Sequence, residues 1–228
     1  MPTTRRDFLG LLGGSSLSAL AAPSLTAQPA LAANVPRRLH PAPVDNTFDI
    51  TWADRVQGKF RAVFDSPQIS EGAALFRAAL WCDEYKSVYG TPRGEMSAVL
   101  VIRHEAIHLA MSDAYWKRFK IGKEMKLKTP EGKKWAEANP ILTTPPGAPP
   151  QFARYNVPDF IADGGIVLAC GVAFSEVVAL FAKADKLDKD AARQRAIEQM
   201  IPGVILQPSG IFAVLRAQEA GCRYVLAS

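Results

Sequence analysis

Short runs of apolar residues recur along the chain and predict buried β-strands. Two of these runs, residues 97–102 and 165–169, are apolar at nearly every position, as strands covered on both faces of a sheet require. Shorter runs at residues 59–64, 204–207 and 223–226 predict three further strands. The pattern therefore indicates a sheet of five strands.

The segments between these runs have the spacing of apolar positions that is typical of helices. Ser70 is placed to cap a helix over residues 71–89, and Gly90 is placed to end it. A turn at Arg103 leads into helical pattern that continues through Phe119. Further helices are predicted over residues 172–184, 189–200 and 210–220.

Strands that alternate with helices along a chain form parallel sheets covered by helices on both faces. We therefore predict a single α/β domain over residues 58–228, with a mainly parallel five-stranded sheet and helices on both faces. Residues 33–57 are expected to form a linker before it. Residues 125–158 interrupt the alternation with seven prolines and little periodicity. An insertion of this length is more often a lid, an oligomer arm or a site wall than a plain connector.

The first 32 residues have the pattern of an export signal. Arg5 and Arg6 precede a stretch of apolar and small residues that closes on an Ala-Leu-Ala cleavage site before Ala33, with a weaker alternative after Ala21. This arrangement resembles a twin-arginine signal. A proline ends the apolar stretch below the ~20 residues that a membrane-spanning helix needs. The sequence therefore predicts export of the folded chain to the periplasm.

The charge balance of the mature chain argues against some classes of partner. Removal of the leader takes two of the 27 basic and one of the 22 acidic residues, which leaves a net charge of +4 with histidine neutral. The lysines of residues 120–134 flank a segment broken by glycine and proline, without the interleaved aromatic residues of a nucleic-acid groove. No later apolar run approaches membrane-spanning length. We expect no nucleic-acid partner, and no membrane contact after cleavage.

Three cysteines are an odd number, which rules out a complete disulfide framework. Cys170 stands at the end of an apolar strand and directly before a helix, where Gly171 permits a close approach of backbone. Ligands of parallel sheets bind at this edge, and the free N–H groups of a helix start stabilise a thiolate. From its position alone, Cys170 is equally well explained as a reactive thiol and as a small hydrophobic residue packed in the core. Core packing is favoured for Cys82, on an apolar helix face, and for Cys222, after a helix-ending glycine.

A His-Glu-x-x-His sequence begins at His104 and ends at His108, and it matches the zinc-protease pattern. That chemistry needs both histidines inside one continuous helix, whereas the preceding strand places His104 in a turn. The extended pattern also lacks its third ligand, because Met111 and Ala114 stand where glycine and histidine are needed. We therefore expect no bound metal and interpret His108 as an ordinary helix residue.

Four stretches of the chain resemble the DsrE/DsrF-like sulfur-handling family and occur in that family's order. They are residues 99–107 with 111–116, residues 165–170, residues 200–204, and residues 208–210 with 218–221. The resemblance covers residues 58–228. It implies a parallel α/β fold, trimeric or hexameric assembly, and a cysteine that carries sulfur as a persulfide. By its position in the motif, that cysteine is Cys170.

The resemblance and the leader together predict a periplasmic sulfur carrier or sulfurtransferase-like protein. Cys170 would accept sulfane sulfur and His104 would steer its protonation, with Arg103 and Gly171 as binding residues at the same strand ends. The expected partners are further copies of the chain, a sulfur donor or acceptor of unknown identity, and the twin-arginine export machinery. We expect no cofactor.

Two other functions remain open at this point. One is a non-catalytic oligomeric module that binds a small ligand at the same strand ends. The other, ranked third, is a zinc hydrolase that uses the His-Glu-x-x-His sequence. Apolar side chains in and beside the insertion support assembly, since they are hard to bury in a loop of a monomer. They are Trp135, Ile141, Leu142, Phe152 and Tyr155.

Overall fold

The computed structural model describes residues 47–129, 132–143 and 155–228. The chain divides into two units, residues 1–43 and 44–228, and the fold below is that of the second. The predicted leader, residues 1–32, lies outside the described residues. Among the helices that are described, none has both the length and the apolar character needed to cross a bilayer.

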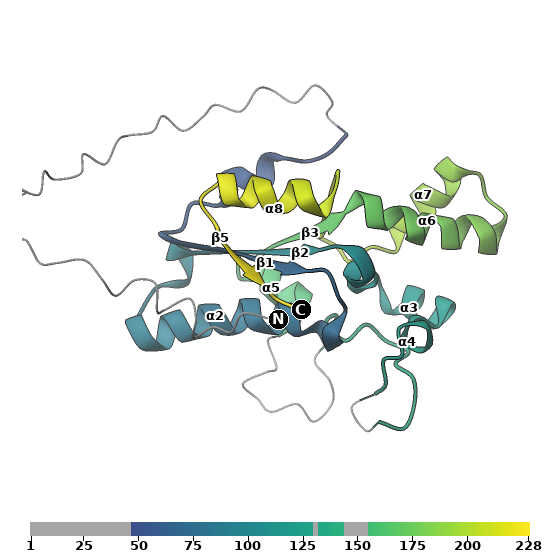
Figure 1. Cartoon of the computed structure of the whole chain (residues 1–228), viewed down its shortest axis with the longest axis horizontal. Coiled ribbons are helices and arrows are strands. Elements are labelled where there is room, and N and C mark those ends of the chain that lie inside the picture. The colour runs from purple at the N-terminus through teal and green to yellow at the C-terminus, as the bar shows by residue number, and fades with distance from the viewer. Residues whose placement is uncertain (1–46, 130–131, 144–154) are drawn as a thin grey trace, which may run out of the picture. The chain divides into compact units, whose positions relative to one another are not determined.

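The predicted five-stranded sheet is present, and its strands are all parallel (Figure 1). Its spatial order is β4-β3-β2-β1-β5, so that the strand formed last along the chain lies beside the first. Because all strands point the same way, their carboxyl ends meet at one edge of the sheet. The strands are β1 (Phe60–Ser66), β2 (Met96–Ile102), β3 (Ile166–Cys170), β4 (Ile205–Gln207) and β5 (Arg223–Leu226).

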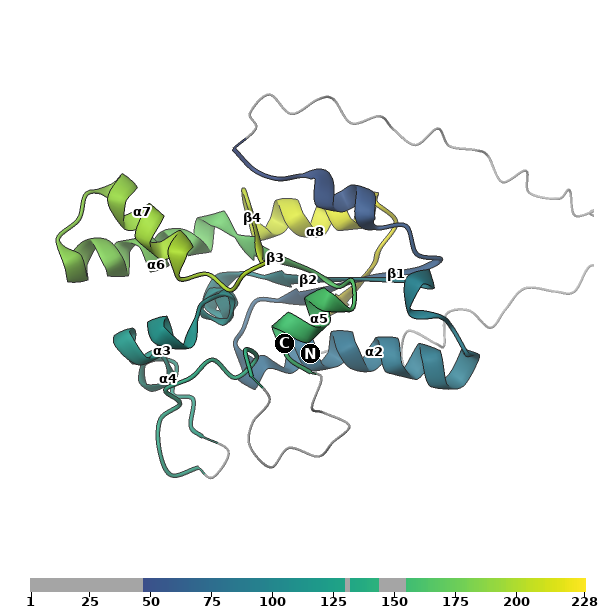
Figure 2. The same ribbon diagram turned by 180° about the vertical axis from the view of Figure 1, so that it is seen from behind.

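Helices cover both faces of the sheet, as predicted (Figures 1 and 2). Successive side chains of a strand point to opposite faces, so Phe64 of β1 packs in the core under α2 (Ala73–Tyr89). Its neighbour Val63 packs in a second core under α8 (Gly210–Glu219). The α2 face also holds α5 (Val157–Ala162), and the α8 face holds the 3₁₀ helix η2 (Thr51–Arg55). The remaining helices are η3 (Ser70–Gly72), η4 (Arg93–Glu95), η5 (His104–Ala110), α3 (Asp113–Phe119), α4 (Ile121–Glu124), α6 (Gly171–Asp185) and α7 (Lys189–Glu198).

The start of α2 differs from the prediction that Ser70 caps a helix over residues 71–89. Ser70, Glu71 and Gly72 have φ values of 38°, 55° and 84°, which are left-handed and incompatible with a right-handed helix. The helix therefore begins at Ala73 without a side-chain cap. Its predicted end is confirmed, because Gly90 adopts φ 66° and donates its N–H to carbonyls of the last turn.

The continuous helical pattern expected after Arg103 is also divided. Residues 104–110 form the 3₁₀ helix η5, and Met111 leaves it to make an isolated bridge with Met200. A new helix, α3, then begins after Ser112, whose side chain accepts the N–H of Tyr115. The helix stops at Met111, because the backbone of this residue is extended where it pairs with Met200.

The packed domain begins before residue 58, where the linker was expected to end. Trp52 of η2 is completely buried, and its indole N–H donates to Gln207 at 2.9 Å. The predicted insertion, residues 125–158, is described only in part, because residues 130–131 and 144–154 fall outside. Within the described part, Ile141 is 3% exposed and packs into the core beside Gly72.

Candidate functional site

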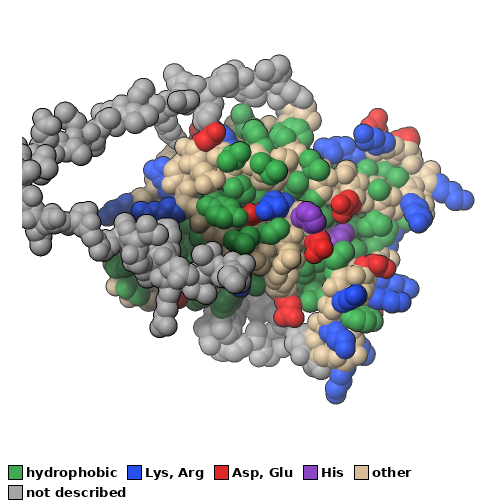
Figure 3. Space-filling view, viewed as in Figure 1, with side chains coloured by type: hydrophobic (Ala, Val, Ile, Leu, Met, Phe, Trp, Pro, Cys, Tyr) green, Lys and Arg blue, Asp and Glu red, His purple; other side chains and the backbone are tan. Residues whose placement is uncertain are grey.

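The carboxyl edge of the sheet brings together residues that lie far apart in the sequence. Asp65 lies near the end of β1, Arg103 directly follows β2, Cys170 ends β3 and Gln207 ends β4. On this face of the molecule, charged and histidine side chains lie together between patches of hydrophobic side chains (Figure 3). This edge contains all four residues predicted as site residues, namely Arg103, His104, Cys170 and Gly171.

Cys170 is the N-cap residue of α6. Its Sγ atom accepts the backbone N–H of Ala173 at 3.4 Å, and the residue is 6% exposed. The cap places the sulfur at the positive end of the dipole of a 15-residue helix. Gly171 makes this junction possible, because a Cβ atom there would lie 2.6 Å from the Gln207 carbonyl oxygen. The predicted close approach at Gly171 is confirmed.

Arg103 is held by a buried carboxylate on the neighbouring strand. Its Nε and Nη2 atoms donate to the two Asp65 oxygens, each at 2.8 Å, and the Tyr224 hydroxyl donates to the same carboxylate at 2.8 Å. Asp65 is only 2% exposed, so these three donors replace the water that it loses on folding. The hydrogen bond with Asp65 is also the main reason that the pKa of Arg103 is raised.

The stem of Arg103 packs on the first residue of α8. A Cβ atom at Gly210 would lie 2.5 Å from the Cβ of Arg103, so only glycine leaves room for this arginine. Cys170 also raises the pKa of Arg103, by a smaller amount, because the two side chains lie within electrostatic range. The edge thus combines a thiol at a helix N-terminus with a guanidinium whose direction is set by its partners. Such an arrangement can hold an anionic sulfur species.

His104 and His108 have different environments. His104 is exposed and adopts φ 54°, a left-handed conformation at the turn after β2. His108 is 5% exposed, and its Nδ1 lies 2.8 Å from the Tyr115 hydroxyl. Burial lowers the pKa of His108 to about 4. No side-chain hydrogen bond or ion pair of His104 occurs within the described part of the chain.

This geometry does not suit zinc. In a 3₁₀ helix with three residues per turn, positions i and i+4 point about 120° apart, unlike in an α-helix. Across the residues that the structure describes, no group of three or more His, Cys, Asp or Glu side chains could hold a metal ion. The arrangement therefore offers no support for the zinc-hydrolase alternative.

The other two cysteines are packed in opposite cores. Cys82 lies in the core under α2 and Cys222 in the core under α8, each 6% exposed. Burial raises the pKa of both thiols to about 11. Neither is a cap residue of a helix N-terminus. The preference for core packing at both positions is confirmed.

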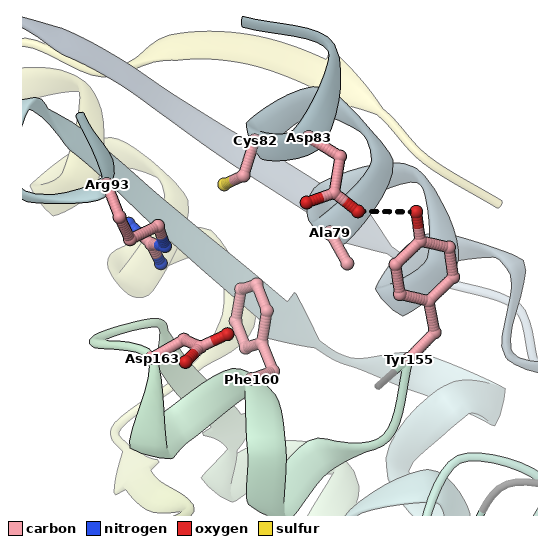
Figure 4. Close-up of a pocket in the computed structure, with 7 residues that line it drawn as sticks. All are labelled: Ala79, Cys82, Asp83, Arg93, Tyr155, Phe160 and Asp163. Atoms are coloured by element: carbon pink, nitrogen blue, oxygen red, sulfur yellow. Dashed lines mark hydrogen bonds between the residues drawn. The ribbon is translucent and has the colours of Figure 1, made fainter. Parts of the chain in front are cut away.

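Sequence reasoning missed Asp65, Tyr224 and a pocket under α2. A signal for Asp65 existed, because it is a charged residue inside an apolar strand. Figure 4 shows the pocket, in which Cys82 and Asp83 of α2 face Phe160 across a space of about 80 Å³ that is partly open to solvent. The complete lining is Ala79, Cys82, Asp83, Arg93, Tyr155, Phe160 and Asp163.

Apolar side chains are exposed on α8 and on the edge strand β5. We call this set the α8–β5 surface, and its members are between 38% and 69% exposed: Ile211, Phe212, Leu215, Tyr224 and Leu226. Figure 3 shows hydrophobic side chains gathered over these elements. The sequence had located such a surface in the insertion, which is wrong for Ile141, because that side chain is buried in the chain's own core.

No family model matches the chain, and no curated protein matches it.

Proposed function

We propose that this protein is a periplasmic sulfur carrier in which Cys170 holds sulfane sulfur. The observation that carries the proposal is the hydrogen bond from the Ala173 N–H to Cys170 Sγ at the start of α6. A helix N-terminus stabilises a thiolate and, equally, the persulfide anion that replaces it. Arg103, at the neighbouring strand end, lies within electrostatic range of Cys170, although its main partner is Asp65.

The transfer step is an exchange of sulfur–sulfur bonds. The Cys170 thiolate attacks the terminal sulfur of a donor R–S–SH, a new Cys–S–SH bond forms, and the donor's S–S bond breaks. The electron pair of the broken bond leaves on RS⁻, so the step needs no external oxidant or reductant. In this proposal His104, which is exposed at the same edge, gives a proton to the leaving thiolate. Delivery to an acceptor thiolate is the same exchange in reverse.

Mass spectrometry of the intact protein tests the proposal. Incubation with inorganic polysulfide at neutral pH is expected to add 32 Da, about the mass of one sulfur atom, and peptide mapping is expected to place it on Cys170. Cys170→Ser is expected to abolish the addition. Cys82→Ser and Cys222→Ser serve as matched controls, because their thiols are buried with pKa values near 11 and their loss leaves the addition unchanged. Sulfur on Cys82 or Cys222, with an inert Cys170, contradicts the proposal.

The small exposure of Cys170, 6%, favours a second candidate. A thiol that reagents do not reach would be structural, and the edge would then serve as the site of a non-catalytic module for a small ligand. Alkylation with iodoacetamide near pH 7 separates the two functions. A sulfur carrier is expected to be labelled first at Cys170, whereas a binding module is expected to show no preference for it.

The proposal includes assembly with further copies of the chain. The α8–β5 surface supports it, since among the described residues β5 pairs only with β1, at the edge of the sheet and next to exposed apolar groups. Light scattering at micromolar concentration is expected to give a multiple of the chain mass. Leu215→Glu is expected to reduce that mass, whereas Val88→Glu, also exposed but on α2, is expected to leave it unchanged. A mass of one chain for the unaltered protein would refute assembly.

A further inference from the structure

The pocket under α2 lies at the opposite edge of the sheet from Cys170. Two of its residues precede strands: Arg93 comes three positions before β2, and Asp163 comes three positions before β3. The pocket is therefore at the amino ends of the strands, separated from the carboxyl edge by the length of β3, on the order of 15 Å. A ligand bound here would be independent of sulfur chemistry at Cys170.

Arg93 presents an unsatisfied donor to this region. Its Nη1 atom donates to the Met96 carbonyl oxygen at 2.7 Å, which anchors the guanidinium beside the start of β2. Its Nη2 atom is buried and has no hydrogen-bond partner within the described residues. A buried charged donor without an acceptor is costly, and such groups are rare in folded proteins. An acceptor from outside the described residues, either water or a ligand, would satisfy this donor.

The other polar groups of the pocket have the opposite charge. Asp83 accepts the Tyr155 hydroxyl at 2.7 Å, as the dashed line in Figure 4 shows. Asp83 and Asp163 both lie close enough to Cys82 to raise the pKa of its thiol, after the larger effect of burial, whereas Arg93 lowers it. One cationic and two anionic side chains thus line the same pocket. Carboxylates have several acceptor positions, so each can take a further hydrogen bond beyond those it already makes.

These charges select among classes of ligand. A simple anion would satisfy Arg93 but would meet two carboxylates, and a simple cation would leave Arg93 Nη2 without an acceptor. An apolar molecule would pair with neither the guanidinium nor the carboxylates. A small zwitterion satisfies both, and Ala79 and Phe160 offer apolar contact for a short side chain.

We propose that this pocket binds a small free α-amino acid, with its carboxylate on Arg93 Nη2 and its ammonium group between Asp83 and Asp163. The pocket holds a volume of about 80 Å³ and opens to solvent, which limits the ligand to a small one. The amino acid carries both charges at the spacing of two bonds, which suits a small pocket lined by charged groups of both signs.

Protection of Cys82 from alkylation tests the proposal in the unaltered protein. Cys82 lines the pocket and Cys222 does not, yet both are 6% exposed with pKa values of about 11, so Cys222 is an internal control. The probes are L-alanine, L-serine and L-valine, with propionate and ethylamine as analogues of L-alanine that lack one charge. At a concentration ten times its dissociation constant, the best amino acid is expected to slow iodoacetamide labelling of Cys82 about tenfold. Labelling of Cys222 is expected not to change.

Calorimetry on a variant supplies the second measurement. Arg93→Gln keeps amide donors but loses the charge, and it is expected to weaken amino-acid binding about tenfold or more. Arg195→Gln, an exposed position on α7, is the matched control and is expected to bind like the unaltered protein. Three results would each overturn the proposal: no Cys82-specific protection by any of the three amino acids, equal protection by propionate or ethylamine, or unchanged affinity in a folded Arg93→Gln. Should that variant not fold, the protection assay decides alone.

Discussion

Mild acid is expected to destabilise the protein through His108. The imidazole is 5% exposed, and burial lowers its pKa from 6.5 to about 4. In the unfolded chain the same group returns to its ordinary value near 6.5. Between these two values the unfolded chain binds a proton that the folded protein does not. Stability due to this group is therefore complete above about pH 6.5 and is lost as the pH falls towards 4.

The size of the effect follows from the difference between the two pKa values. Each unit corresponds to about 1.4 kcal/mol, so the full difference amounts to roughly 3 kcal/mol. Over the narrower interval from pH 7 to pH 5, the free energy of unfolding is expected to fall by about 2 kcal/mol on account of His108 alone. That is a considerable part of the 5–15 kcal/mol by which domains are usually stable.

Urea unfolding at pH 7, 6 and 5, followed by tryptophan fluorescence, measures this effect. Carboxylates also contribute to acid sensitivity, so the informative quantity is the difference between the unaltered protein and His108→Gln. The variant is expected to lose about 2 kcal/mol less between pH 7 and pH 5. His104→Gln is the matched control, because His104 is exposed, and it is expected to keep the slope of the unaltered protein. Parallel curves for the unaltered protein and His108→Gln would refute the reasoning.

Three further predictions concern single positions. Gly210→Ala is expected to cost about 1–3 kcal/mol in urea unfolding, since the new Cβ would lie 2.5 Å from an arginine side chain, whereas Gly94→Ala meets no atom within 4 Å and is expected to be nearly neutral. Asn139→Ala is expected to cost about 2–4 kcal/mol in urea unfolding. The Asn139 side-chain amide is 1% exposed and donates to two backbone carbonyls, which lose their donor in the variant; a loss below about 1 kcal/mol would contradict this. Replacement of Arg5 and Arg6 by lysine is expected to keep the precursor in the cytoplasm, and unchanged periplasmic accumulation on cell fractionation would defeat the twin-arginine assignment.

Features set by neighbouring residues could be predicted from the sequence. Strands β2 and β3 each begin within one residue of the expected position, because a continuous apolar run has one favourable placement in a sheet covered on both faces. The end of α2 at Gly90 was also predictable, because the left-handed conformation that ends the helix is set by the glycine itself. The junction of Cys170 and Gly171 was predictable for the same reason, since strand, cap and helix follow one another directly.

Features set by distant residues could not be predicted. Asp65 meets Arg103 across 38 positions and Tyr224 across 159, and only the strand order brings them together. Arg93 of η4 and Cys82 of α2 likewise line one pocket only because the chain folds back between them. The left-handed turn at Ser70 is also a tertiary effect. Ser70 has the residue type of a cap, but the chain bends before α2 where Gly72 packs against Ile141, 69 positions away.

The separation of the three cysteines affects how the protein survives in an oxidising environment. Cys82 and Cys222 lie on opposite faces of the sheet, and Cys170, which packs on the same face as Cys82, lies at the other end of the strands, so no two of the thiols meet. The native fold therefore forms no disulfide between its own cysteines. Unfolding removes this separation and releases all three thiols at once, and a disulfide between any two of them would then be incompatible with refolding. Outside the cytoplasm, the lifetime of the protein is governed by its rate of unfolding, because each opening can end in chemical capture.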